Sequence, residues 1–338
     1  VRRLRLDERG LDAIGGALFE VTRLPDPVGE VVERTERPDG LLVERVRAPL
    51  GLVAMIYESR PNVTVEAAAL LLKSGNAGLL RGGAEALGTN LALAAAIRRG
   101  LEGTEVPPEA VAVVPRADRE DVRRIVQMEG LVDLAIPRGG EGLIRAVAEV
   151  AKVPVLRHDR GVCHVYVDAA ADLEVARRVI LDGKTSNPAT CNATECALVH
   201  RDVAEALLPA LEADLQAAGV AVHREEAAWG REFLDLALAL RVVDSLDAAL
   251  DHIARFGSRH SEAIVTRDEA AARRFQREVD ASCVLWNAST RLNDGGCLGL
   301  GTEIGISTTK LHAYGPMGLR ELTTVKFVVS GWGHIRGR

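Results

Sequence analysis

The chain has 338 residues, of which 47% are hydrophobic, 27% charged and only 3% aromatic, and its formal net charge is −6. This length exceeds what one simple core fills and suits two domains. The acidic balance argues against binding to the phosphate backbone of nucleic acids, and the scarcity of aromatic side chains argues against base-stacking platforms. No apolar stretch reaches the roughly 20 residues that cross a bilayer.

Five cysteines, an odd number without any Cys-x-x-Cys pair, suggest neither a disulfide framework nor a zinc site. The first residues lack the apolar core of a signal peptide. We therefore expect a reduced, cytoplasmic protein. Because the sequence begins with Val1 instead of Met, we also expect a trimmed or partial chain.

The pattern of the first 150 residues changes near Gly51. Before it, a short helix precedes two alternating segments, 28–34 and 41–46, whose Pro38-Asp39-Gly40 turn predicts a hairpin. After it, continuous apolar runs alternate with helical periods, which is typical of a parallel, doubly wound sheet. We expect strands at 52–57, 78–80, 111–114 and 132–136, and helices at 63–73, 84–99, 118–127 and 140–150.

A second series of the same type begins near Lys184. After Trp286 the chain is rich in Gly, Asn and Thr, which predicts irregular loops that line a site. The chain ends in an apolar strand, 322–329, with no following segment to pair with. We expect the strands of this series at 196–200, 236–243, 262–266 and 281–286, and its helices at 202–217, 246–256 and 268–278.

Cys191 is the candidate nucleophile. It lies in a polar loop between a helical stretch and an apolar run, where a thiol has access to solvent. Cys163, Cys196 and Cys283 fall within strand patterns and read as small buried hydrophobic residues. Cys297 follows two glycines and is a weaker second candidate. The residues alone favour a nucleophilic role for Cys191 over a structural one by roughly two to one.

A dinucleotide site is only loosely indicated. The Gly-x-Gly-x-x-Gly fingerprint is missing after every predicted strand. Arg138-Gly139-Gly140 does lead from a strand into a helix, whose N-terminal N–H groups suit a phosphate, but an ordinary glycine-rich turn is about equally consistent. Arg81 ends another strand, where a guanidinium suits a ribose phosphate. Taken alone, such an arginine is more often a solvated surface charge.

A series of motifs in the same order along nearly the whole chain resembles one family. They include IYESRPNVT at 56–64, KSGNA at 73–77, IPRGG at 136–140, GVCHVYVD at 161–168, CNA at 191–193, WNASTR at 286–291 and GLGTEIGIS at 299–307. These motifs resemble the gamma-glutamyl phosphate reductase family, also called glutamate-5-semialdehyde dehydrogenase, of the aldehyde dehydrogenase superfamily.

The resemblance implies an aldehyde dehydrogenase-like α/β fold with two doubly wound parallel-sheet domains and a small oligomerisation flap. Residues 1–183 would form the NADPH-binding domain, with the hairpin 28–48 in the flap. Residues 184–315 would form the catalytic domain and 316–338 the C-terminal oligomerisation strand. The flap would pair the hairpin with the final strand and extend across a homodimer or larger assembly.

The implied reaction is the NADPH-dependent reduction of L-glutamyl 5-phosphate to L-glutamate 5-semialdehyde and phosphate, the second step of proline biosynthesis. Cys191 would attack the acyl phosphate to form a thioester, which hydride then reduces. The Cys191 N–H and Asn62 are candidates for the oxyanion hole. The resemblance also implies a glutamate 5-kinase partner that supplies the labile acyl phosphate.

The resemblance further assigns cofactor residues. Arg81 would meet the 2′-phosphate and so favour NADPH. Arg138, Gly139 and Gly140 would contact the pyrophosphate, and Glu232 the nicotinamide ribose. By this resemblance, the strand end at Arg81 and the strand end at Arg138 would both bind NADPH.

For the substrate, Arg60 and Arg291 are candidate holders of the phosphate and the α-carboxylate. Arg157 occupies the position where hydrolytic relatives keep a water-activating Glu, which favours reduction over hydrolysis. The chain departs from the family pattern at Asp159-Arg160 and at Tyr314, and we expect it to lack the family's N-terminal helical segment. Two alternatives stay open: another acyl-phosphate or aldehyde oxidoreductase of the superfamily, or an inactive fragment that only assembles with partners.

Overall fold

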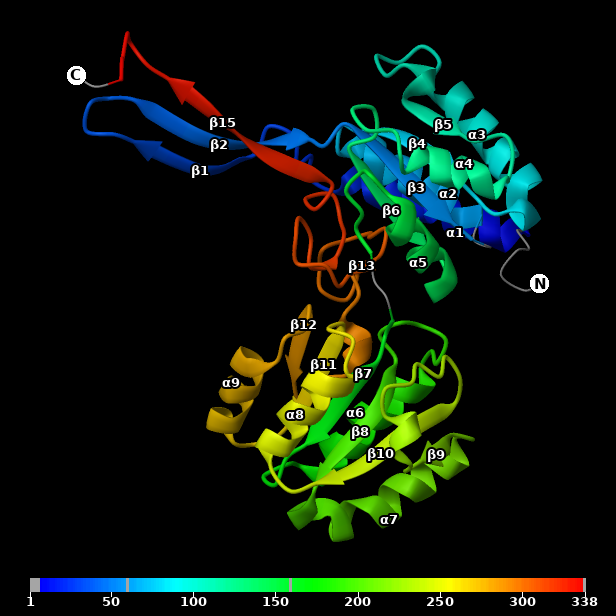
Figure 1. Cartoon of the computed structure of the whole chain (residues 1–338), viewed down its shortest axis with the longest axis vertical. Helices are drawn as coiled ribbons and strands as arrows, with labels where there is room; N and C mark the ends of the chain where they lie inside the picture. The colour runs from blue at the N-terminus through cyan, green and yellow to red at the C-terminus, as the bar shows by residue number, and fades with distance from the viewer. Residues whose placement is uncertain (1–6, 59–60, 158–159, 337–338) are drawn as a thin grey trace. The chain divides into compact units, whose positions relative to one another are not determined.

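The computed structural model describes residues 7–58, 61–157 and 160–336. Contacts divide the chain into two compact units, and each is described by itself (Figure 1). The first unit comprises Val1–Arg157, Leu300–Gly305 and Met317–Arg338, and the second comprises His158–Gly299 and Ile306–Pro316. Among the described helices, none is both long and apolar enough to cross a membrane.

The first unit is built on a four-stranded parallel sheet in the order β5-β4-β3-β6. The strands are β3 (Leu52–Tyr57), β4 (Ala77–Arg81), β5 (Val111–Val113) and β6 (Leu134–Arg138). Its helices are α1 (Glu8–Arg23), α2 (Pro61–Lys73), α3 (Leu87–Leu101), α4 (Arg119–Ile125) and α5 (Glu141–Val150). The chain adds β4 and β5 on one side of β3 and then β6 on the other. This reversal creates a switch point at the carboxyl ends of β3 and β6, where ligands bind in open α/β sheets.

A separate three-stranded antiparallel sheet has the order β1-β2-β15. The hairpin strands β1 (Val31–Glu36) and β2 (Leu42–Pro49) form as expected, and Gly40 takes φ +83° in their turn. The final strand, β15 (Thr323–Ser330), pairs with β2 along its whole length, from Thr323 opposite Pro49 to Ser330 opposite Leu42. The strand without a sequence neighbour therefore pairs with the hairpin. Its proposed extension across a dimer stays a prediction.

The second unit contains a six-stranded, all-parallel sheet in the order β12-β11-β7-β8-β10-β9. Its strands are β7 (Cys163–Val167), β8 (Thr194–His200), β9 (Ala221–His223), β10 (Ala237–Val243), β11 (Ser261–Val265) and β12 (Cys283–Trp286). Its helices are α6 (Leu173–Thr185), α7 (Arg201–Ala217), α8 (Leu246–Phe256) and α9 (Glu269–Glu278). Alternate residues of each strand face opposite layers: α6 and α7 pack on one face, α8 and α9 on the other. The predicted parallel α/β class is thus confirmed in both units.

Two details differ from the sequence-based expectation. The boundary expected at 183/184 falls inside α6, whereas the contacts separate the units after Arg157. The reason is that β7 pairs with both β8 and β11, so it belongs to the middle of the second sheet. The segment after Trp286 is also less irregular than expected, since β13 (Ile306–Ser307) and β14 (Gly315–Pro316) pair there.

Candidate active site

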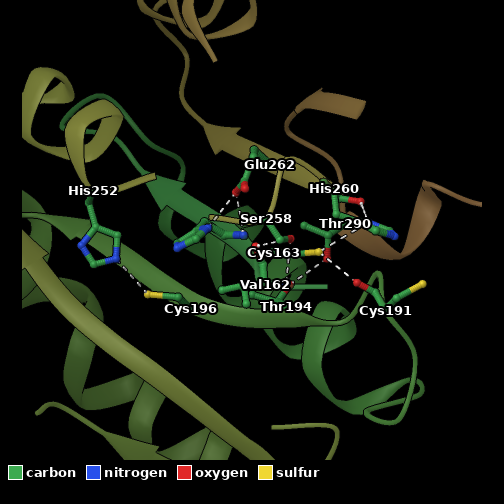
Figure 2. A network of polar contacts seen from close by, with 12 residues as sticks. Val162, Cys163, Cys191, Thr194, Cys196, His252, Ser258, His260, Glu262 and Thr290 are labelled. Atoms are coloured by element: carbon green, nitrogen blue, oxygen red, sulfur yellow. Dashed lines mark hydrogen bonds and ion pairs between the residues drawn. The ribbon is translucent and has the colours of Figure 1, made fainter. Parts of the chain in front are cut away.

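The loop that carries Cys191 connects α6 to β8 in the second unit. Cys191 is half-buried, so its thiol is neither a core side chain nor fully exposed. A backbone hydrogen bond of 3.0 Å from the Ala193 N–H to the Thr190 carbonyl closes a turn around it. Figure 2 shows the Cys191 sulfur pointing away from the buried polar network, while its carbonyl oxygen faces Cys163. The arrangement fixes the backbone and leaves the sulfur on the outer side.

Cys163, the first residue of β7, holds the backbone of Cys191 through a hydrogen bond. Its thiol donates a 3.2 Å hydrogen bond to the Cys191 carbonyl. Burial raises the pKa of Cys163, and the negative charge of Glu262 raises it further. A fully buried thiol with a raised pKa keeps its proton and serves as a donor, not as a nucleophile. Cys163 therefore positions the Cys191 peptide and does not compete with it chemically.

Gly161 makes the close approach between the two segments possible. A Cβ at this position would overlap the carbonyl group and Cα of Cys191. The Gly161 N–H donates a 2.9 Å hydrogen bond to Oε1 of Glu232, which holds the segment that leads into β7. Glu232, expected at a cofactor ribose, thus contacts the segment beside the nucleophile loop.

We expect Gly161→Ala to lower the thermal unfolding midpoint by several degrees, because the added methyl meets backbone and forced overpacking costs about 1–3 kcal/mol. Gly88→Ala is the matched control, since a Cβ on this glycine, the second residue of α3, meets nothing within 4 Å and a Gly→Ala change within a helix is neutral or slightly stabilising. Thermal unfolding followed by circular dichroism measures both. Equal midpoints for the two variants would contradict the close approach.

Arg291 also holds the loop that carries Cys191, through hydrogen bonds to three of its side chains. Its Nε donates to Ser186 Oγ at 3.2 Å and its Nη1 to Thr190 Oγ1 at 3.0 Å, and Nη1 also bonds the Asn192 side-chain oxygen. Arg291 was expected to hold a substrate anion, but in this structure its guanidinium braces the Cys191 loop. The other expected anion holder, Arg60, lies outside the described residues.

A buried ion pair, Lys184–Glu195, joins the two ends of the nucleophile loop. Lys184 in the last turn of α6 and Glu195 in β8 are both fully buried, with 2.6 Å between Nζ and Oε2. Lys184 also donates to the Asp235 carbonyl, and the Leu234 N–H donates to Glu195. Burial raises the pKa of Glu195 to about 7, against the opposing effect of Lys184. The sequence reasoning missed this pair, although a Lys and a Glu flanking the loop were a visible signal.

In the first unit, the expected pyrophosphate residues gather at the switch point between β3 and β6. Arg138 ends β6 and Gly140 is the N-cap of α5, which has no side-chain cap of its own. The carboxylate of Glu58, just after β3, accepts a 3.1 Å hydrogen bond from the Gly140 N–H. A Cβ on Gly139 would overlap that carboxylate. An anionic group therefore already lies against this helix N-terminus, which is the chemistry that suits a phosphate.

Arg81 ends β4 at the same edge of the sheet and is buried. Its Nη2 donates to the carbonyls of Ala117 at 2.9 Å and Asp118 at 3.1 Å. Its buried Nε has no hydrogen-bond partner within the described part of the chain. The side chain is therefore not the solvated surface charge that its sequence context alone favoured.

Asn62 is the second residue of α2 in the first unit, and its amide donates a 2.9 Å hydrogen bond to Glu66. Cys191 belongs to the second unit, so the pairing of the two in an oxyanion hole stays a prediction. Arg157 ends the first unit, and Tyr314 lies in the second, where its hydroxyl donates to Asp280 at 3.3 Å.

Comparisons with known proteins show the family of the chain. The model of the aldehyde dehydrogenase family matches residues 18–230. The gamma-glutamyl phosphate reductase of Anaeromyxobacter dehalogenans is 57% identical over 99% of this chain and 82% of its own length, and that of Geobacter metallireducens is 51% identical over 99% and 83%.

Solved structures give the same result. The crystal structure of gamma-glutamyl phosphate reductase from Thermotoga maritima matches with a TM-score of 0.98 and 46% identity over 99% of this chain and 84% of that one. An engineered glycolyl-CoA reductase with bound NADP⁺ shares the fold, with a TM-score of 0.73 at 17% identity over 97% and 89%.

Proposed function

The chain belongs to the gamma-glutamyl phosphate reductase family of the aldehyde dehydrogenases, and from this premise we propose that it reduces L-glutamyl 5-phosphate to L-glutamate 5-semialdehyde, releasing phosphate, in proline biosynthesis. The observation that carries the proposal is the Cys191 loop: a half-buried thiol whose backbone is held by Cys163 and whose loop is held by Arg291. Family membership and the α/β fold already make the chain an aldehyde dehydrogenase-type oxidoreductase.

In the proposed reaction the Cys191 thiolate attacks the acyl carbon, a C–S bond forms, and the C–O bond to phosphate breaks with its electron pair leaving on phosphate. The Cys191 N–H, with Asn62, would stabilise the oxyanion of the tetrahedral intermediate. NADPH, when bound, supplies the hydride that takes the thioester to the aldehyde level. Cys191 then leaves as a thiol after taking up one proton. The hydrogen bond from the Ala193 N–H to the Thr190 carbonyl would keep the peptide that carries the Cys191 N–H in one orientation.

The residues at the β3–β6 switch point fit a nicotinamide dinucleotide. Gly139 and Gly140 at the start of α5, with Arg138, would hold the pyrophosphate, and the Glu58 carboxylate would turn away from the Gly140 N–H to admit it. Arg81 would meet the 2′-phosphate, and Glu232 the nicotinamide ribose. The free Gly140 N–H and the helix dipole then stabilise the ligand instead of Glu58.

We expect Arg81→Ser to lower kcat/KM for NADPH by roughly 10–100-fold, the loss that follows from one charge-assisted phosphate contact. The rate with NADH should change little, because NADH has no 2′-phosphate. Parallel steady-state kinetics with both cofactors measure the difference. An equal loss with both would mean that Arg81 only braces the 117–118 loop through its carbonyl contacts.

Arg60 and Arg291 are the proposed holders of the substrate anions, although Arg291 would have to share its guanidinium with the Cys191 loop.

The proposal includes a homodimer or larger assembly through the β1-β2-β15 sheet, and a glutamate 5-kinase that delivers the labile acyl phosphate. It also includes a cytoplasmic location, which the five unpaired cysteines support.

The deciding experiment is the reverse reaction: phosphate-dependent oxidation of glutamate semialdehyde with NADP⁺, measured beside a panel of other aldehydes. We expect glutamate semialdehyde to be oxidised with the highest kcat/KM and only when phosphate is present. Equal rates across the panel would favour a different aldehyde oxidoreductase of the superfamily. No reaction with any aldehyde, from a folded protein, would favour a chain that only assembles with partners.

A further inference from the structure

A second cluster of reactive side chains is buried in the second unit, on the face of the sheet that α8 and α9 cover. The register places Glu262 of β11 beside His164 of β7, and His164 beside Cys196 of β8. The three side chains thus form a lateral row across adjacent strands. His252 projects onto this row from α8, and in Figure 2 its ring faces the Cys196 sulfur. All four residues are buried.

The donor atoms converge. One ligand atom each from His164, Cys196 and His252 lie within 4.8 Å of one another. Nδ1 of His164 lies 2.9 Å from Oε2 of Glu262, an arrangement that fixes the ring and leaves Nε2 for another partner. Nε2 of His164 is buried and has no hydrogen-bond partner among the residues that the structure describes. An unpartnered buried nitrogen beside a thiol is a costly feature unless a ligand uses it.

His252 has a different role from His164. Its Nδ1 lies 2.7 Å from Nη1 of Arg241, and a guanidinium can only donate. Nδ1 is therefore the acceptor, and Nε2 carries the proton that points to the Cys196 sulfur at 3.7 Å. Because the Nδ1 that accepts the bond from Arg241 carries no proton, the His252 ring is neutral. His252 is a hydrogen-bond donor to the sulfur, and the atoms left to bind an ion are the Cys196 sulfur and Nε2 of His164.

We propose that Cys196 and His164 bind one soft, monovalent metal ion, with copper(I) as the best fit, and that Glu262 and His252 orient these two ligands. Thiolate and imidazole ligands select soft ions. Metal–ligand bonds of roughly 2 Å place two opposed ligands about 4 Å apart, which the observed separation allows. Copper(I) accepts two ligands, whereas structural zinc requires four.

The charges of the cluster also select a monovalent ion. With the ion bound, the Cys196 thiolate and Glu262 contribute two negative charges, and Arg241 and the ion contribute two positive charges. The cluster, counted with the partly buried Arg241, is then neutral, whereas a divalent ion would add one uncompensated positive charge beside the core. A metal ion binds the thiolate and an unprotonated imidazole nitrogen, so binding is coupled to the release of protons.

The test uses the full chain with Cys191→Ser and Cys297→Ser as the background, because these half-buried and exposed thiols would otherwise bind copper themselves. The protein is expressed in copper-supplemented medium, purified without oxygen, and challenged with a copper(I) chelator. We expect one retained copper per chain in the background protein and in a Cys283→Ser control. Adding Cys196→Ser should weaken retention by more than about 100-fold, since even the loss of an outer-shell partner costs 10–100-fold.

X-ray absorption of the background protein gives a readout that needs no further variant, and one sulfur with one nitrogen at the copper is the expected result. Three outcomes would each overturn the proposal: no retained copper in the background protein, full retention after Cys196→Ser, or preferential retention of zinc from a mixed-metal medium. None of these readouts depends on the reductase activity.

Discussion

Cys191→Ala is expected to lower the rate of phosphate-dependent oxidation of glutamate semialdehyde by about 10³-fold or more, while leaving the fold intact. The nucleophile and its covalent intermediate are lost together, and no other described thiol takes the same position. The stability effect is small because the Cys191 side chain is only half-buried and its sulfur points away from the core. The semialdehyde assay and thermal unfolding measure the two effects separately.

Cys297→Ala is the matched control, because Cys297 is exposed and lies in the same unit. Its activity should equal that of the wild type. Thiol labelling at neutral pH gives a second comparison, in which Cys191 should react faster than Cys297 despite being less exposed. Activity retained by Cys191→Ala, or slower labelling of Cys191, would remove the basis of the proposed mechanism.

Much of the fold could be predicted because the strands of a parallel sheet are apolar on both faces and therefore read as continuous runs. β3 was expected at 52–57 and is found at Leu52–Tyr57. β6 was expected two residues too early, since its apolar run starts before the sheet pairing does: Leu134 is the first residue to pair, opposite Val53. Pro137 within it is tolerated because β6 is an edge strand.

The candidate site was predicted only as far as it is local in sequence. Cys191 was found from the composition of its own loop. Its partner Cys163 lies 28 positions earlier and meets it only because β7 and β8 are neighbours in the sheet. The same applies to His164 and Glu262, which are 98 positions apart. A pattern of polar and apolar residues predicts strands but not their lateral order, and these contacts depend on that order.

Lys184→Met is expected to destabilise the second unit by about 3–5 kcal/mol, the cost of breaking a buried ion pair and leaving one charge unpaired. Methionine preserves the length of the side chain but not its charge. Arg273→Met is the control, because Arg273 and Glu269 form an exposed pair at 3.1 Å whose loss should cost less than about 1 kcal/mol. Urea unfolding at pH 8 measures both variants, and equal losses would contradict a special role for the buried pair.

The pH dependence of the stability loss shows whether an unpaired Glu195 charge causes it. Burial already raises the pKa of Glu195 above its ordinary 4.5, and Lys184 is the charge that opposes this; without Lys184 the pKa of Glu195 rises further. A carboxyl whose pKa is higher in the folded state than in the unfolded state favours folding below its unfolded pKa and loses that contribution as the pH rises through the folded pKa. The loss in free energy of unfolding caused by Lys184→Met should therefore be smaller at pH 5 than at pH 8. Adding Glu195→Gln should remove most of this pH dependence. A deficit that stays constant across this range would mean that the lost packing of the Lys184 side chain, and not an unpaired Glu195 charge, destabilises the ends of the Cys191 loop.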